Sequence, residues 1–230
     1  MTTHYEQTGS GSPIIYLHGW GCDKSVFRPI TDRLPNFCNY CIDFAGFGDS
    51  SAPPKCGWTV FDYANQLIEF LDERVGAAVT VVAHSFGCRV AAIAAVLRPE
   101  LISGLLLIAP AGLRRFSLKR WFKVRRYKLK KLLHKADGLG SDDYKQCGEA
   151  MRNTFVKVVN QDLSAYVRRI TQPTLIVASK ADQAVSVKDA RRYAKLVKLS
   201  ELVEIEGDHF AFFYAPKAFA ETVSLFANRG

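Results

Sequence analysis

The 230-residue sequence contains no apolar run of 18 residues, the shortest that would span a bilayer as a helix, so we expect no transmembrane helix. Its first residues show no basic segment followed by an apolar one, and we therefore expect no secretory signal. It also lacks internal repeats and low-complexity tracts, which argues against a repeat architecture. The six cysteines of a chain without a signal predict reduced thiols and a cytoplasmic location.

Acidic residues are missing from one stretch of the chain. Residues 114–135 contain eleven lysines and arginines and no aspartate or glutamate, whereas the other 208 residues contain 20 basic and 22 acidic side chains. The net charge of +9 is therefore local, and the sequence describes a near-neutral domain that carries one basic segment. Hydrophobic residues make up 48% and charged residues 23%, which is typical of a soluble globular protein.

Short apolar runs alternate along the chain with longer stretches of helical spacing. This alternation predicts an α/β fold, with a mostly parallel twisted sheet covered by helices on both faces. The length fits one domain. The predicted strands cover residues 14–17, 39–44, 78–83, 105–109, 173–179 and 201–205. The predicted helices cover residues 24–34, 59–75, 86–97, 188–199 and 216–228.

A long interruption separates two of the predicted strands where a short connection would suffice. It covers residues 111–170 and contains the basic segment and a second helical stretch at 144–159. We therefore predict that residues 1–110 and 171–230 form the core and that residues 111–170 form an inserted helical lid.

The pentapeptide Ala83-His84-Ser85-Phe86-Gly87 lies between a predicted buried strand and a predicted helix. A serine between two small residues on a strand-to-helix turn is typical of the nucleophile elbow of a serine hydrolase. The turn is tight, so larger side chains at positions 83 and 87 would collide. The sequence therefore predicts Ser85 as a catalytic nucleophile.

A serine hydroxyl needs a general base, and the base needs an acid that orients it. Asp182 follows the predicted strand at 173–179, and His209 follows the strand at 201–205. Both residues therefore lie beyond the carboxyl ends of parallel strands, at the same sheet edge as Ser85. We predict His209 as the base and Asp182 as the acid, with Asp208 as the rival acid.

The other four histidines are weaker candidates for the base. His18 and His84 adjoin turn backbone, His4 is near the terminus, and His134 lies in the basic segment. A histidine in such a place is more often structural or solvated than catalytic.

The tetrapeptide His18-Gly19-Trp20-Gly21 follows the first predicted strand. Its glycines allow backbone N–H groups to turn toward the elbow. The N–H groups of Trp20 and Phe86 are the predicted oxyanion hole, and each contributes about 3 kcal/mol to transition-state stabilisation.

These motifs together resemble the α/β-hydrolase superfamily, in its lidded group of esterases, C–C bond hydrolases and epoxide hydrolases. The resemblance also rests on Asp43-Phe44-Ala45-Gly46-Phe47-Gly48-Asp49-Ser50 and on Gly207-Asp208-His209-Phe210, and it covers residues 14–228 outside the lid. The chain departs from the usual pattern by Ala83 in place of glycine and Ala45 in place of proline. Few residues precede the His18-Gly19 strand, so we expect one of the usual leading strands to be absent.

The resemblance implies hydrolysis without a cofactor, and we expect no metal site. The dehalogenases and epoxide hydrolases of the family have aspartate at the nucleophile position. Because Ser85 occupies that position here, the resemblance disfavours these two activities. The predicted function is hydrolysis of an ester or thioester of a small to medium acyl compound. The alternatives are a C–C bond hydrolase of the same fold, and a slow-turnover ligand-binding or peripheral membrane protein that retains the triad.

The basic segment has the spacing of an amphipathic helix of about 33 Å. Its apolar stripe includes Leu118, Trp121, Phe122 and Leu129. We favour a lid helix whose stripe packs over the pocket, with Trp121 at the substrate. Three alternatives stay open, namely attraction of an anionic substrate or carrier, weak contact with a membrane surface, and nucleic-acid binding, which nothing else in the chain suggests. The oligomeric state is not predicted.

Arg125 falls inside this apolar stripe, where an unpaired buried cation is costly. Its side chain could extend to water, or the helix could break near Val124. A third hypothesis is that the guanidinium points into the pocket and binds a carboxylate or phosphate of the substrate.

Overall fold

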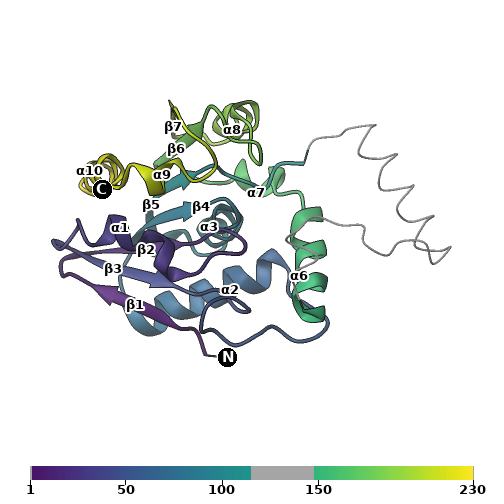
Figure 1. The fold of residues 1–230 in the computed structure, drawn as a ribbon. Helices are drawn as coiled ribbons and strands as arrows, with labels where there is room; N and C mark the ends of the chain where they lie inside the picture. The colour runs from purple at the N-terminus through teal and green to yellow at the C-terminus, as the bar shows by residue number, and fades with distance from the viewer. Residues whose placement is uncertain (1, 115–147, 230) are drawn as a thin grey trace.

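The computed structural model describes residues 2–114 and 148–229. Its centre is a seven-stranded sheet in the order β1-β3-β2-β4-β5-β6-β7 (Figure 1). The strands are β1 (Tyr5–Thr8), β2 (Ser12–Leu17), β3 (Phe37–Ile42), β4 (Val79–His84), β5 (Ile102–Ile108), β6 (Thr174–Ser179) and β7 (Ser200–Ile205). The sheet confirms the predicted α/β fold class.

Strand β1 pairs antiparallel with β3, whereas the strands from β3 to β7 pair parallel with their neighbours. The sequence analysis missed β1, because this edge strand has four residues, of which two are exposed and two half-buried. It is the one strand that the structure describes before β2.

Helices cover both faces of the sheet (Figure 1). They are α1 (Arg28–Thr31), α2 (Val60–Phe70), α3 (Phe86–Leu97), α6 (Glu149–Asn160), α7 (Ser164–Val167), α8 (Val187–Ala194), α9 (Ala211–Tyr214) and α10 (Pro216–Ala227). The helix predicted at 24–34 is a 3₁₀ turn followed by α1. The helix predicted at 188–199 ends at Ala194, where the Leu196 N–H donates to the Tyr193 carbonyl in a tighter turn.

The strand alternation divides the core between the two faces. On β2, Ile15 and Leu17 belong to the core cluster that includes residues of α2, α3 and α8, whereas Ile14 and Tyr16 belong to the cluster that includes residues of α1 and α10. All four side chains are fully buried, which is typical of a central parallel strand.

The segment between β5 and β6 corresponds to the predicted lid. Its described part, residues 111–114 and 148–170, contains α6 and α7. Residues 115–147, with most of the basic segment, lie outside the described residues. Within the described parts of the chain, none of the helices combines the length and the apolar character needed to cross a membrane.

Candidate active site

Ser85, Asp182 and His209 each follow a strand of the parallel part of the sheet. Ser85 comes directly after β4, Asp182 follows β6, and His209 follows β7. The carboxyl ends of parallel strands share one edge of the sheet, so the three residues lie at that edge.

The backbone at Ser85 is strained. Its φ of 50° and ψ of −102° are unusual for a residue with a Cβ, and its N–H donates to the Ile108 carbonyl at 2.9 Å. Gly87 packs against the end of β2, because a Cβ built there would lie 2.3 Å from the Leu17 carbonyl oxygen. The glycine is therefore required for the close approach of α3 to β2, and Ser85 is presented at the start of α3.

His209 and Asp182 form a hydrogen-bonded pair. The His209 Nδ1 lies 2.7 Å from Asp182 Oδ2, and the other carboxylate oxygen accepts the N–H groups of Ala184 and Val185 at 2.7 and 2.8 Å. Burial would raise the pKa of Asp182, but the bond from His209 and the two backbone donors outweigh it, so the pKa is lowered. Asp182 is thus held as a carboxylate and orients the imidazole of His209.

The rival acid, Asp208, is exposed, and its hydrogen bonds are made to the backbone of the residues that follow it. Its Oδ1 accepts the Phe210 N–H at 2.8 Å, and its carbonyl accepts the Ala211 N–H. These bonds shape the turn into α9, whereas the carboxylate that bonds the His209 ring is that of Asp182.

The peptide unit between Gly19 and Trp20 is fixed through its carbonyl. The His18 Nε2 accepts the Phe44 N–H at 3.1 Å, so the ring proton is on Nδ1, which donates to the Gly19 carbonyl at 2.8 Å. The Cys22 N–H donates to the same carbonyl at 3.2 Å. Because C=O and N–H point in opposite directions across a trans peptide, these bonds also set the direction of the Trp20 N–H.

Phe86 supplies the second predicted donor. It is the first residue of α3, so its N–H has no carbonyl one turn earlier in the helix to bond. The rings of Trp20 and Phe86 meet edge to face, with centroids 5.4 Å apart, which brings the two predicted oxyanion donors into neighbouring segments.

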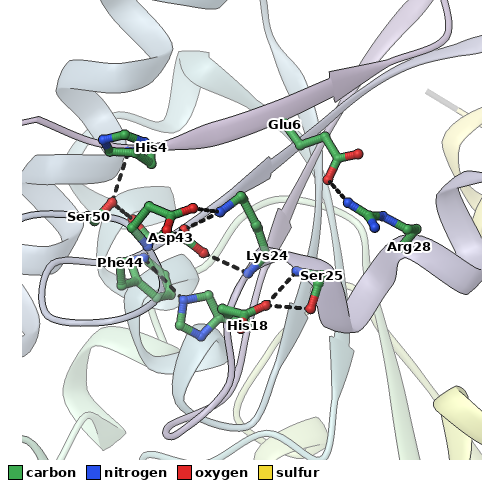
Figure 2. Close-up of polar contacts among 11 residues, drawn as sticks. His4, Glu6, His18, Lys24, Ser25, Arg28, Asp43, Phe44 and Ser50 are labelled. Atoms are coloured by element: carbon green, nitrogen blue, oxygen red, sulfur yellow. Dashed lines mark hydrogen bonds and ion pairs between the residues drawn. The ribbon is translucent and has the colours of Figure 1, made fainter.

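An ion pair with a buried carboxylate anchors the loop that carries Trp20. Figure 2 shows Lys24 beside Asp43, whose side chain is fully buried. Asp43 accepts the Lys24 backbone N–H and its ammonium, each at 2.7 Å, together with the Asp49 N–H at 3.0 Å. A Cβ on Gly48 would lie 2.2 Å from Asp43 Oδ2, so the turn after β3 needs glycine to wrap this carboxylate. The network ties the loop after β2 to the loop after β3.

The ring of Trp20 contacts phenylalanines from three segments. The centroids of Phe47, Phe86 and Phe155 lie 4.9, 5.4 and 5.1 Å away, each close to edge on. Phe155 belongs to α6, so the insertion between β5 and β6 reaches this loop. The sequence analysis missed the contact, because Phe155 follows Trp20 by more than 100 residues and no local pattern connects them.

Helix α6 is bonded to the core along its length. Thr154 Oγ1 accepts the Trp58 N–H at 2.9 Å. At the carboxyl end of the helix, Arg89 of α3 donates to the carbonyls of Val158 and Gln161 at 3.0 and 3.1 Å. Arg89 thereby links the helix that starts at Ser85 to the helix that carries Phe155.

The two lid residues predicted to touch substrate, Trp121 and Arg125, lie outside the described residues. Across residues 2–114 and 148–229, no group of three or more His, Cys, Asp and Glu side chains is arranged to hold a metal ion.

Comparison with known proteins identifies the family of the chain. Residues 14–222 match the sequence family described as the alpha/beta hydrolase family. The match spans most of the chain, which therefore belongs to that family, as the resemblance implied. The family assignment also supports the prediction that the chain is an enzyme.

Two relatives align over nearly the whole chain. A 2-hydroxy-6-oxo-6-(2'-aminophenyl)hexa-2,4-dienoic acid hydrolase of Metapseudomonas resinovorans is 24% identical, over 100% of this chain and 88% of that protein. A pimeloyl-(acyl-carrier protein) methyl ester esterase of Vibrio vulnificus (strain YJ016) is 22% identical, over 98% of each. Among solved structures, the esterase EaEST of Exiguobacterium antarcticum has a TM-score of 0.80 at 21% identity, over 98% of this chain and 95% of that chain. This structural likeness concerns the fold.

Proposed function

We propose that this member of the alpha/beta hydrolase family is a serine hydrolase that cleaves an ester or thioester of a small to medium acyl compound. Ser85, His209 and Asp182 form its catalytic triad, and the N–H groups of Trp20 and Phe86 form its oxyanion hole. The observation that carries the proposal is the 2.7 Å bond from His209 to the buried Asp182, at the sheet edge where Ser85 is held in a strained turn.

In the proposed mechanism, the Ser85 Oγ attacks the acyl carbon while His209 Nε2 takes the hydroxyl proton. The tetrahedral oxyanion accepts the N–H groups of Trp20 and Phe86. His209 then returns the proton to the departing alcohol or thiol, which leaves the acyl group on Ser85. A water molecule that gives a proton to His209 attacks this acyl-enzyme, and His209 returns the proton to Ser85 Oγ as the bond to the acyl group breaks and the acid is released. Asp182 holds the imidazole in the tautomer that each step requires.

The aromatic surroundings of Trp20 suit an apolar acyl group. The rings of Phe47, Phe86 and Phe155 pack at steep angles to the Trp20 indole, beside the peptide proposed to supply the oxyanion donor. We assign residues 111–170 as the lid over this site. The eleven cations of residues 114–135 favour an anionic substrate or carrier, and the relative from Vibrio vulnificus is named for an ester carried on a protein. Weak contact of this segment with a membrane surface is the alternative.

Hydrolysis of a C–C bond is the second candidate, because the relative from Metapseudomonas resinovorans aligns with the entire chain. In that reaction water is added across the bond next to a ketone, and the products are a carboxylic acid and a shortened dienoic acid. Loss of the dienol chromophore of such a substrate, compared with turnover of p-nitrophenyl esters, distinguishes the two activities.

The test of the proposal is the replacement of Ser85. Ser85→Ala should lower the turnover of p-nitrophenyl acetate by roughly 10³-fold or more and leave the unfolding transition in place, because the hydroxyl forms the covalent bond. A fluorophosphonate should label the unmodified protein at Ser85, and Ser103→Ala, which changes an exposed serine of β5, should be labelled equally well. Labelling that persists in Ser85→Ala contradicts the assignment of the nucleophile.

The unit character of the triad gives a second test. His209→Ala should be about as damaging as Ser85→Ala, and the double variant little worse, since the residues act together. If the unmodified protein turns over p-nitrophenyl acetate no faster than Ser85→Ala does, the alternative of a binding protein is favoured.

The cytoplasmic location stays a prediction from the sequence, and cell fractionation tests it.

A further inference from the structure

His84 connects the turn that carries Ser85 to the loop that carries His209. It is the last residue of β4, directly before Ser85, and its side chain is 1% exposed. Strand alternation turns this side chain to the face of the sheet where Val82 packs, opposite to the face of Ala83. On that face it meets the segment after β7, 125 residues further along the chain.

The contact with His209 is a hydrogen bond to the backbone. The His84 Nε2 lies 2.9 Å from the His209 carbonyl oxygen, which can only accept, so Nε2 carries the proton. The rings of the two histidines lie 4.6 Å apart, and the rings of Phe210 and Phe212 lie 5.1 and 4.8 Å from His84. The His84 ring is therefore packed along the turn that presents the His209 imidazole.

The second ring nitrogen of His84 faces the loop of the predicted oxyanion hole. A Cβ built on Gly19 would lie 2.7 Å from His84 Nδ1 and 3.6 Å from the Ser85 Cβ. Among the described residues, this nitrogen has no hydrogen-bond partner, and leaving a buried acceptor unpaired costs free energy. Burial lowers the pKa of His84 to about 3, so the ring stays neutral rather than donating from both nitrogens.

An apolar side chain would fill this space without an unpaired nitrogen. The histidine is explained by what its other nitrogen does, because only a donor at the Nε2 position can hold the His209 carbonyl. We propose that His84 is a positioning residue, which fixes the backbone of His209 against the turn of Ser85 and so sets the distance between the two side chains. This inference rests on the proposed function, since it concerns the geometry between nucleophile and base.

The test compares substitutions that keep or remove the donor. The amide nitrogen of Gln in His84→Gln reaches about as far as Nε2, whereas the shorter amide in His84→Asn does not, and His84→Leu has no donor. With p-nitrophenyl acetate, His84→Asn and His84→Leu should lower kcat by roughly 10- to 100-fold with KM within about threefold, because small misplacements of reacting groups have effects of that size. His84→Gln should stay within about threefold of the unmodified kcat.

Rates are counted per active site, titrated by fluorophosphonate, so that loss of folded protein does not imitate loss of alignment. Tyr193→Leu is the control, because Tyr193 is also a fully buried ring and lies on α8 in the core of the opposite face. This variant should lose stability and keep its kcat per titrated site. If His84→Leu does not fold, the comparison of His84→Gln with His84→Asn still decides.

Two results would overturn the inference. The first is an unchanged kcat per site in His84→Leu or His84→Asn. The second is an equal loss in His84→Gln and His84→Asn, which would show that the ring itself and not its donor matters. If the unmodified protein is neither labelled at Ser85 nor active, the proposed function fails and the inference fails with it. An active, labelled protein with indifferent His84 variants rejects the inference alone.

Discussion

Acidification from pH 7 to pH 5 should destabilise the fold through two buried histidines. His18 is completely buried and His84 is 1% exposed, and burial lowers their pKa values to about 4 and about 3. In the unfolded chain a histidine has a pKa of about 6.5. Below about pH 6.5 these two histidines bind protons in the unfolded chain but stay neutral in the folded chain. The free energy of unfolding therefore falls as the pH falls.

The size of the loss follows from these pKa values. Each ring contributes a slope of about 1.4 kcal/mol per pH unit once the pH is well below 6.5 and above the folded pKa. Between pH 7 and pH 5 this amounts to about 2 kcal/mol for each histidine, or about 4 kcal/mol for both. The free energy of unfolding of a typical domain is about 5–15 kcal/mol, so a loss of this size is large enough to measure.

Urea unfolding at the two pH values measures the loss. The His84→Gln variant lacks one of the two titrations, so its free energy of unfolding should fall by about 2 kcal/mol less than that of the unmodified protein. His4→Gln is the control, because it also removes a histidine but an exposed one. The reasoning is refuted if the unmodified protein and His84→Gln lose the same amount, which would mean that His84 takes up its proton in the folded state.

Substitutions in the proposed site give the remaining predictions. Asp182→Asn should lower kcat/KM for p-nitrophenyl acetate by roughly 10³-fold, and Asp208→Asn by less than about threefold; the reverse order would make Asp208 the acid. Gly87→Val should lower the free energy of unfolding by about 1–3 kcal/mol or more, because its Cβ would press on the Leu17 carbonyl, and unchanged urea unfolding would contradict that packing. Arg125→Met should spare neutral esters and raise KM for anionic ones, and equal effects on both would remove the hypothesis of a substrate-binding guanidinium.

The elements around the site could be predicted because their signals are local. An apolar run that ends in a small-residue turn predicts the position of the serine. The carboxylate and the histidine each follow a later predicted strand. The rule that the carboxyl ends of parallel strands share one edge of the sheet then predicts that the three residues lie at that edge. The structure has strands β4, β6 and β7 ahead of Ser85, Asp182 and His209. The choice of Asp182 over Asp208 could not be tested from the sequence, because both residues follow the end of a predicted strand. The structure shows that the carboxylate of Asp182 bonds to the His209 ring.

The parts that could not be predicted depend on contacts between distant segments. Strand β1 is short and partly exposed, so it has no apolar run to reveal it. Phe155 contacts Trp20 across a long sequence separation, because bonds such as those of Arg89 and Thr154 hold α6 on the core. Such side-chain contacts leave no periodic trace in the sequence, because each residue is unremarkable among its own neighbours.

Three histidines, His18, His84 and His209, lie in the candidate site, and their surroundings favour different protonation states. His18 accepts an N–H at one nitrogen and donates to a carbonyl at the other, which a neutral ring does and a charged ring cannot. His84 is buried with one nitrogen unpaired, and the nearby His209 further disfavours a charge on it. Of the three, only His209 has a carboxylate at one nitrogen, so in the proposed mechanism the positive charge formed when Ser85 loses its proton would be stabilised at His209 and disfavoured at the other two rings. A proton accepted at His18 Nε2 would displace the Phe44 N–H, and a proton accepted at His84 Nδ1 would bury a positive charge beside Gly19 with no acceptor among the described residues, so both rings are expected to stay neutral while His209 acts as the proposed base.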